Sequence, residues 1–303
     1  MLKLALFVLL LPQILLNSNK CLAQASESEY IAATTSAGMR TWRLRVKPEF
    51  LAVADKDAKE IINSTKLSIP RAGNFNAFSS FENDTPRIII PFGLLAINDY
   101  IVNNTLFSMH NPKCSKYLEK TILDLRREYI QYIKDGVPRK VRTVWDYCGM
   151  TQQESETFFR QTDIYNASVA MQVDAIAAII GHELGHLILR HRRYSDISKL
   201  EAQKQEYAAD DYGFDLSMRA GFNPAAALGA TYLFFLALEG ENAPTGTHPR
   251  ASCRIIRLAD SLLFDRYIKE GYWKKEFKEP PSKSDQTRLM ASLKPLREDC
   301  SLP

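Results

Sequence analysis

Two histidines within one short segment can bind the same metal ion. His182 and His186 are one helical turn apart with Glu183 between them, and apolar residues recur at helical spacing over residues 169–191. Both imidazoles therefore project from one face of the expected helix, whereas Glu183 is turned by about 100° and lies beside the ion. This spacing indicates a zinc site in which a glutamate activates a zinc-bound water.

A zinc site with an open catalytic position needs a third protein ligand. A third histidine in the metzincin arrangement is excluded, because Leu189 and Arg192 occupy the positions of the required glycine and histidine. His191 falls off the ligand face of the helix. We expect it to be an ordinary histidine at a helix end, where the negative end of the helix dipole favours it.

A second expected helix, over residues 197–219, carries acidic residues that can complete the site. Glu206 is the candidate for the third ligand, and Asp210, one turn later, can accept the spare N–H of a metal-bound histidine. Ala208 and Ala209 between them are small enough to let the two helices approach closely. The alternative for both carboxylates is a solvated helix face, since other acidic residues lie nearby.

Three motifs together resemble a known family. They are the segment from His182 to His186, the segment from Glu206 to Asp210, and Thr247-His248-Pro249 followed by Arg254. On these motifs the chain is similar to the gluzincin zinc metallopeptidases that include the CAAX prenyl endopeptidases, the HtpX heat-shock proteases and the BepA-like periplasmic proteases. Residues 76–78, 87–90 and 93–95 also resemble the part of those proteins that precedes the active-site helix.

The resemblance implies a fold and a set of roles. The fold is a mainly helical α+β domain of the zincin type, with a small β-sheet whose edge strand borders the active-site cleft. The cofactor is one Zn²⁺ per chain, and its ligands are His182, His186 and Glu206. Glu183 would be the catalytic base, and His248 would donate to the oxyanion of the reaction. Asp210 and Arg254 would support the ligands from behind.

The segments ahead of the zinc helix predict one helix and two strands. Residues 87–90 are β-branched and apolar between prolines, which favours a strand at the edge of a sheet. An unfolded or extended polypeptide substrate would add to that edge as a further strand. The alternation over Thr41–Val46 predicts a half-exposed strand, and a helix is expected over residues 48–62.

Residues 103–166 are predicted to be a helical insertion that the resembled family lacks. A helix is expected over residues 115–134, and another begins at Thr151, where Glu154 completes a capping box. The four cysteines that follow the predicted signal peptide permit three disulfide connectivities, and proximity along the chain favours one of them. The favoured pairs are Cys114 with Cys148 and Cys253 with Cys300.

The N-terminus predicts export. Residues 1–25 have the order of a signal peptide, with a lysine, an apolar run and a small-residue cleavage site. The domain would then span residues 26–270 and a charged, loop-rich tail residues 271–303, in a periplasmic or secreted protein. Charges of both signs are interleaved around a net charge of +4, which argues against nucleic acid as a partner. No membrane-spanning segment is expected in the mature chain.

Two further hypotheses remain open at this point. The first is a binding or chaperone-like factor of the cell envelope whose zinc site is latent. The second is a zinc hydrolase that cleaves an amide other than a peptide bond. Zinc ligands alone do not distinguish these from an endopeptidase that acts on exported or envelope proteins in quality control.

Overall fold

The computed structural model describes residues 27–71, 76–135, 140–223, 248–260 and 268–271, and in the tail residues 282–284, 287, 291 and 293–300. Most of these residues are helical, and they include one small three-stranded sheet. The prediction of a mainly helical α+β fold is therefore confirmed. The predicted signal peptide and Thr247 lie outside the described residues.

The chain divides into two compact units. The first unit comprises residues 1–42, 69–76 and 90–173, and the second comprises residues 43–68, 77–89 and 174–303. The predicted insertion, residues 103–166, lies wholly within the first unit. Its proposed limits fall inside two continuous helices, α6 (Phe92–His110) and α10 (Thr162–Ile188). All the candidate metal ligands belong to the second unit.

The first unit is a helical assembly held by an aromatic cluster. Besides α6 it contains α3 (Glu27–Thr41), η2 (Ser115–Tyr117), α7 (Leu118–Asp135), α8 (Val144–Tyr147) and α9 (Gln152–Phe159). Phe107 is fully buried and packs edge-to-face against Trp145 and Phe158. The predicted capping box is present at the start of α9, whereas the single turn of α8 was not predicted.

The disulfide Cys114–Cys148 is formed in the first unit as predicted. Cys114 is buried in the same cluster as Phe107 and Val144. The bond closes a loop between the end of α6 and the end of α8, which removes conformational freedom from the unfolded chain. It therefore stabilises the folded first unit.

The sheet of the second unit has the order β1-β3-β2, with strands β1 (Lys66–Ser68), β2 (Phe78–Glu82) and β3 (Thr85–Ile89). β3 pairs parallel with β1 and antiparallel with β2, so the prediction that residues 87–90 form an edge strand is wrong. Pro86 is accommodated because it faces Phe81 next to a tight turn, where Asn83 and Asp84 have positive φ. The free edges belong to β1 and β2.

Residues 41–46 form no strand, contrary to the prediction. The helix α3 is followed directly by a wide helical turn, η1 (Trp42–Val46), and by α4 (Lys47–Val53). Trp42, Val46 and Phe50 are buried, whereas Leu44 is 51% exposed, so burial follows a four-residue helical period. The helix predicted over residues 48–62 is interrupted at Ala54, after which Asp55 caps α5 (Lys56–Ser64).

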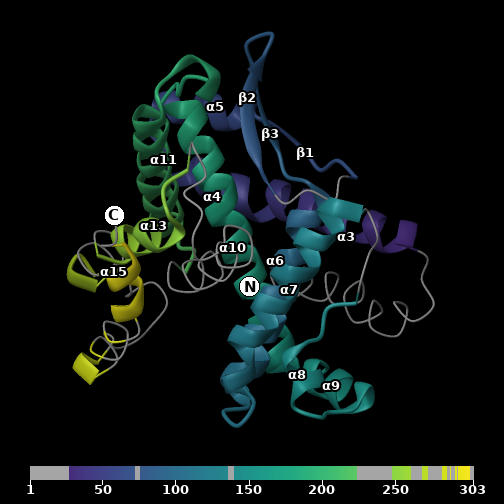
Figure 1. Ribbon diagram of the computed structural model, residues 1–303. Helices are drawn as coiled ribbons and strands as arrows, with labels where there is room; N and C mark the ends of the chain where they lie inside the picture. The colour runs from purple at the N-terminus through teal and green to yellow at the C-terminus, as the bar shows by residue number, and fades with distance from the viewer. Residues whose placement is uncertain are drawn as a thin grey trace. The chain divides into compact units, whose positions relative to one another are not determined.

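Two helices of the second unit cross with their backbones almost in contact (Figure 1). They are the C-terminal half of α10 and α11 (Lys199–Arg219), which Ser198 caps. A Cβ atom added to Gly185 would lie 2.9 Å from the backbone of Ala209. Only residues with little or no side chain permit this approach, so the small residues at the crossing determine how closely the ligand-bearing faces meet. α10 begins seven residues before the predicted helix and ends at Ile188 rather than at His191.

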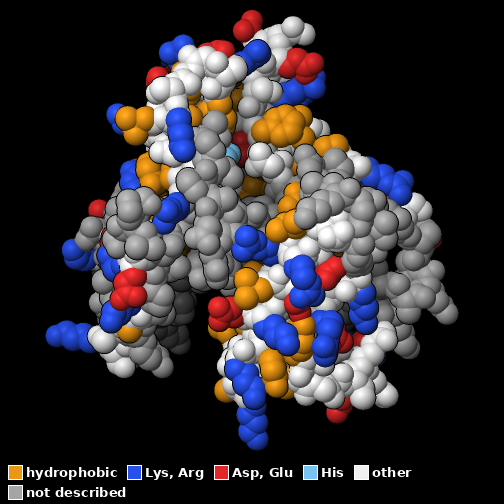
Figure 2. All heavy atoms as spheres, viewed as in Figure 1, with side chains coloured by type: hydrophobic (Ala, Val, Ile, Leu, Met, Phe, Trp, Pro, Cys, Tyr) orange, Lys and Arg blue, Asp and Glu red, His pale blue; other side chains and the backbone are white. Residues whose placement is uncertain are grey.

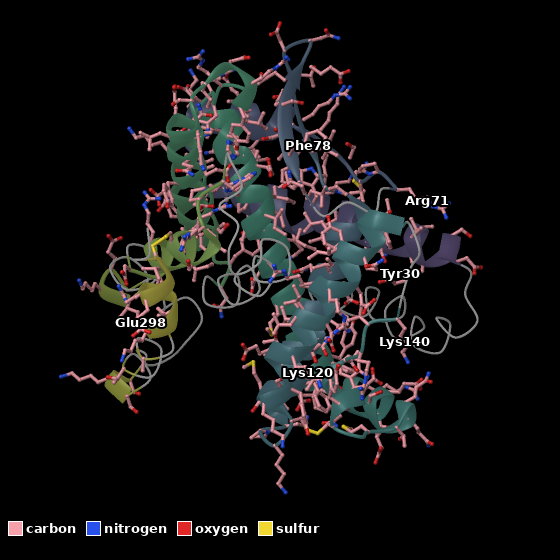
Figure 3. The ribbon with its side chains drawn as sticks, viewed as in Figure 1. Tyr30, Arg71, Phe78, Lys120, Lys140 and Glu298 are labelled. Carbon is pink, nitrogen blue, oxygen red and sulfur yellow. A yellow bond between two sulfur atoms is a disulfide. The ribbon has the colours of Figure 1, made fainter. Side chains whose placement is uncertain are left out.

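The last described helices are linked covalently. α13 (Ala251–Leu258) packs against α15 (Lys294–Cys300), and Cys253 is bonded to Cys300, as predicted. Figure 3 shows this disulfide as a yellow bond beside α15. The tail was expected to be loop-rich, but residues 294–300 form a helix that packs against α13.

Among the described residues, α10 is the one helix long and apolar enough to cross a membrane. Half of its most apolar stretch is buried within the structure, and core helices of soluble proteins have the same length and composition. The prediction of a mature chain without a membrane span stays a prediction.

Candidate metal centre

The side chains of His182, His186 and Glu206 converge on one point. The two Nε2 atoms lie 3.1 Å apart. Glu206 Oε1 lies 3.3 Å from His186 Nε2, and Glu206 Oε2 lies 3.6 Å from His182 Nε2. All the potential ligand atoms fall within 4.8 Å of one another. The two imidazoles are only 14–16% exposed and the carboxylate 1%, so this group could hold a metal ion.

Glu206 is buried with one oxygen free of hydrogen bonds. Tyr194 donates its hydroxyl proton to Oε1. Oε2 accepts no hydrogen bond from the described residues, although His248 Nδ1 lies 3.0 Å away and Arg254 Nη1 lies 3.3 Å away. Burial would raise the pKa of Glu206, but the imidazoles of His186 and His248 and the charge of Arg254 hold it well below its usual range. The carboxylate is therefore an anion with a lone pair available to a cation.

Asp210 supports His182 from the side opposite the ligand cluster. Its Oδ1 lies 2.9 Å from His182 Nδ1, which leaves Nε2 of the same ring directed at the cluster. Arg254 donates two hydrogen bonds to Asp210, from Nε at 2.8 Å and from Nη2 at 2.7 Å. Burial alone would lower the pKa of His182, but Asp210 and the charge of Glu206 outweigh it, and the pKa is raised. Asp210 thus orients the ring as a carboxylate behind a metal-bound histidine does.

Glu183 lies beside the cluster and contributes no atom to it. It follows His182 on α10 and is 5% exposed, and its charge is close enough to raise the pKa of Tyr194 further. A carboxylate in this position can exchange a proton with a group bound near the two imidazoles. This is the position that the helical spacing predicts.

The structure brings all seven sequence-predicted residues of the site together. His248 approaches Glu206 from the segment before α13, and at 28% it is more exposed than His182 and His186. Arg254, from the first turns of α13, contacts both Glu206 and Asp210 of α11. In Figure 2 histidine atoms are visible at the surface next to an acidic side chain, so solvent reaches part of this group.

Comparison with known proteins gives one match. The family model described as Peptidase U49 matches residues 110–286, which is more than half of the chain and includes every candidate ligand. The chain belongs to the Peptidase U49 family. No curated protein and no solved structure matches it. The family establishes a peptidase and does not by itself extend to the gluzincin relatives that the sequence motifs resemble.

Two residues in the matched region of this U49 peptidase were not predicted to belong to the site. Tyr194 contacts Glu206 and packs edge-to-face against His248, with ring centroids 5.9 Å apart. His191 places its Nδ1 2.8 Å from Nδ1 of His186. Burial and, to a smaller extent, the neighbouring His186 lower the pKa of His191 to about 4, which keeps the ring neutral.

The sequence held a signal for one of these residues only. His191 comes three residues after Ile188, the end of α10. A prediction that the helix ends there, and not at His191, would have allowed the chain to turn back and place His191 over His186. Tyr194 lies in a short 3₁₀ turn, η3 (Tyr194–Asp196), whose path depends on contacts with α11 and the segment around His248. No local pattern predicts such contacts.

Proposed function

We propose that this U49 peptidase is a zinc-dependent endopeptidase that cleaves exported or envelope proteins, in keeping with a role in quality control. One observation carries the proposal. Two imidazole Nε2 atoms and a buried, ionised carboxylate, one oxygen of which accepts no hydrogen bond from the described residues, converge on one point, beside a further buried glutamate.

The residues fit zinc. Two nitrogens and one carboxylate oxygen form a ligand set typical of catalytic zinc sites that keep a fourth position open. Burial of an unpaired carboxylate oxygen is costly unless a cation or donor compensates it. Zinc bound there would polarise the carbonyl to be cleaved and lower the pKa of a bound water to about 7. His182, His186 and Glu206 would hold it, one ion per chain.

Glu183 is proposed as the base. It would accept a proton from the attacking water and transfer it to the leaving amine nitrogen, so that the proton count balances over the reaction. Its helical position, one residue after His182, keeps the carboxylate near the ion without coordinating it. Burial at 5% exposure limits competition from bulk water.

His248 is proposed as the donor to the oxyanion that forms on the cleaved carbonyl. Its Nδ1 is held next to Glu206, and its partial exposure allows the ring to contact a substrate. Tyr194 is a second candidate for this role, because its hydroxyl lies at the same carboxylate. Arg254 and Asp210 keep the ligand carboxylate and His182 in place.

The substrate is proposed to bind as an extended strand along β2. The inner strand, β3, is paired on both sides, whereas β2 has β3 on one side only. The guanidinium of Arg190, just beyond α10, stacks over the ring of Phe81 in β2 at 4.6 Å. This contact brings β2 near the end of the helix that carries His186, which supports the choice of this strand. Strand addition uses backbone groups and needs no particular sequence, as suits unfolded substrates.

Export to the periplasm or the exterior is part of the proposal. Both disulfides are compatible with an oxidising compartment.

The alternative function is a chaperone-like factor whose zinc site is latent. The Glu183→Gln variant, which lacks the proposed base, distinguishes this alternative from an endopeptidase.

The test combines metal analysis with proteolysis. Purified protein should contain one zinc per chain by mass spectrometry, and it should cleave an unfolded casein until zinc is removed by chelation. Glu183→Gln should keep the zinc and lose cleavage by about 10²–10⁴-fold, the usual contribution of a general base. Glu201→Gln, an exposed carboxylate on α11, is the matched control and should stay active. Full activity of Glu183→Gln would refute the mechanism, and rescue of a deletion phenotype by this variant would favour the chaperone-like alternative.

A further inference from the structure

The C-terminal end of α10 is closed by two backbone hydrogen bonds that define a Schellman motif. The N–H of His191 donates to the carbonyl of His186 at 3.0 Å, and the N–H of Arg190 donates to the carbonyl of Leu187 at 3.3 Å. Arg190 has φ of 55°, the left-handed conformation that this motif requires at the residue after the helix cap. The chain therefore turns back over its own last helical turn.

This motif fixes which side chains meet. The residue that ends the motif packs against the residue whose carbonyl it binds, and the contact is usually apolar. Here the two residues are both histidines. Their rings lie edge-to-face with centroids 4.9 Å apart, and the two Nδ1 atoms are 2.8 Å apart.

The hydrogen-bond roles follow from the geometry of the site. Nε2 of His186 faces His182 and Glu206, so a metal ligand at this atom must carry no proton. The proton of the neutral His186 ring is then on Nδ1 and is donated to His191 Nδ1, which accepts with its own proton on Nε2. His182 is supported by a carboxylate, whereas His186 meets another imidazole at the corresponding atom.

We infer that His191 is a positioning residue, which holds the second zinc-binding histidine in its ligating orientation and tautomer through the turn that ends α10. The inference rests on the proposed function. The left-handed conformation of Arg190 is strained, and the contact of its guanidinium with the ring of Phe81 offsets part of the energetic cost. The turn that ends α10 thus contacts β2 through Arg190 and the proposed ligand His186 through His191.

The decisive experiment compares His191→Asn with His191→Leu. The oxygen of asparagine can occupy the position of histidine Nδ1 and accept the same hydrogen bond, whereas leucine has nearly the same shape and no acceptor. Zinc affinity is measured by competition with a chromogenic chelator, and the folding of the metal-free proteins by urea denaturation. We expect His191→Leu to weaken zinc binding by about 10–100-fold, as loss of a group behind a ligand does, and His191→Asn to restore most of it. The metal-free variants should unfold at similar urea concentrations.

Arg190→Gly is the control for the turn. Glycine adopts the left-handed conformation without strain, so this variant should keep the zinc affinity of the wild type. Wild-type affinity in His191→Leu would overturn the inference and leave the proposed function intact. Equal losses in His191→Leu and His191→Asn would also overturn it, because packing alone would then explain them. Absence of zinc binding in the wild type would instead refute the proposed function.

Discussion

Gly181 of α10 and Gly213 of α11 face one another at the helix crossing, where a Cβ atom added to Gly213 would lie 2.4 Å from the carbonyl carbon of Gly181. The atom that the added Cβ would meet belongs to the backbone, so there is no flexible side chain that could move aside. The separation of the two helices, and with it the distance between the imidazoles and Glu206, depends on this pair.

Gly213→Ala should therefore force the helices apart. Alanine favours a helix over glycine by about 1 kcal/mol, so any net destabilisation reports the clash. We expect a net loss of about 1–3 kcal/mol in the free energy of unfolding, as overpacking causes, together with weaker zinc binding. Urea denaturation and zinc titration measure the two effects. Gly38→Ala in α3 is the control, because its nearest neighbours are the movable ends of Ile69 and Leu95.

Asp210→Asn should destabilise the protein even without metal. Arg254 is 4% exposed and donates two hydrogen bonds to the Asp210 carboxylate, whose negative charge this change removes. Loss of that charge from a buried ion pair costs about 3 kcal/mol, and zinc affinity should fall by about 10–100-fold. Asp211→Asn removes the neighbouring, partly exposed carboxylate that pairs with Arg257 and should cost less than about 1 kcal/mol. Equal stability of the two variants in urea denaturation would contradict the role given to Asp210.

The buried carboxyl group of Asp99 in α6 should make the free energy of unfolding depend on pH. Burial raises its pKa from 3.8 to about 6, although Asn103 and Gln172 donate hydrogen bonds to it. The unfolded chain ionises this group at a lower pH than the folded chain, so the free energy of unfolding falls as the pH rises from about 4 to 6.

Asp99→Asn should remove that slope and stabilise the metal-free protein by about 3 kcal/mol above pH 6. Urea denaturation at a series of pH values measures it. Asp84→Asn, in the exposed turn between β2 and β3, should leave the slope unchanged. A steeper loss of stability in Asp99→Asn than in the wild type, between about pH 4 and 6, would show that the assigned sign is wrong.

Ser79→Pro tests the binding edge. The pairing of Phe81 with Pro86, which has no N–H, indicates that Ser80 and not Ser79 exchanges ladder bonds with β3. The N–H of Ser79 then points to the free edge, and proline there removes a donor from the substrate without breaking the sheet. We expect kcat/KM for an unfolded substrate to fall about 10-fold, as loss of one backbone hydrogen bond would give. Ser79→Ala keeps the N–H and should cleave normally. An unaffected Ser79→Pro enzyme would place the substrate elsewhere.

The sequence predicted the cluster that could hold a metal ion because helical geometry is local. His182, Glu183 and His186 are fixed by one helical turn, and Glu206 and Asp210 by another, so a correct helix assignment is enough to place them. The approach of the two helices required only that small residues face one another. Both disulfides followed from proximity along the chain.

The errors have a common physical origin in contacts between distant segments. The order of strands depends on which strands pair with β3. The two flanking prolines do not reveal that β3 pairs with a strand on each side. Residues 41–46 alternate in the sequence, yet tertiary burial of Trp42 and Val46 selects a helix. His191 was misplaced because the last turn of α10 ends three residues earlier than apolar spacing suggests.

The second unit is assembled from pieces that leave the ribosome at very different times. Its sheet lies within residues 43–68 and 77–89, whereas the helices it accompanies begin at residue 174, and Arg254 and Cys300 come later still. At about 5–20 residues per second, several seconds separate the emergence of the sheet from that of the ligand-bearing helices. The candidate metal ligands therefore come together only several seconds after the sheet of the same unit has been synthesised.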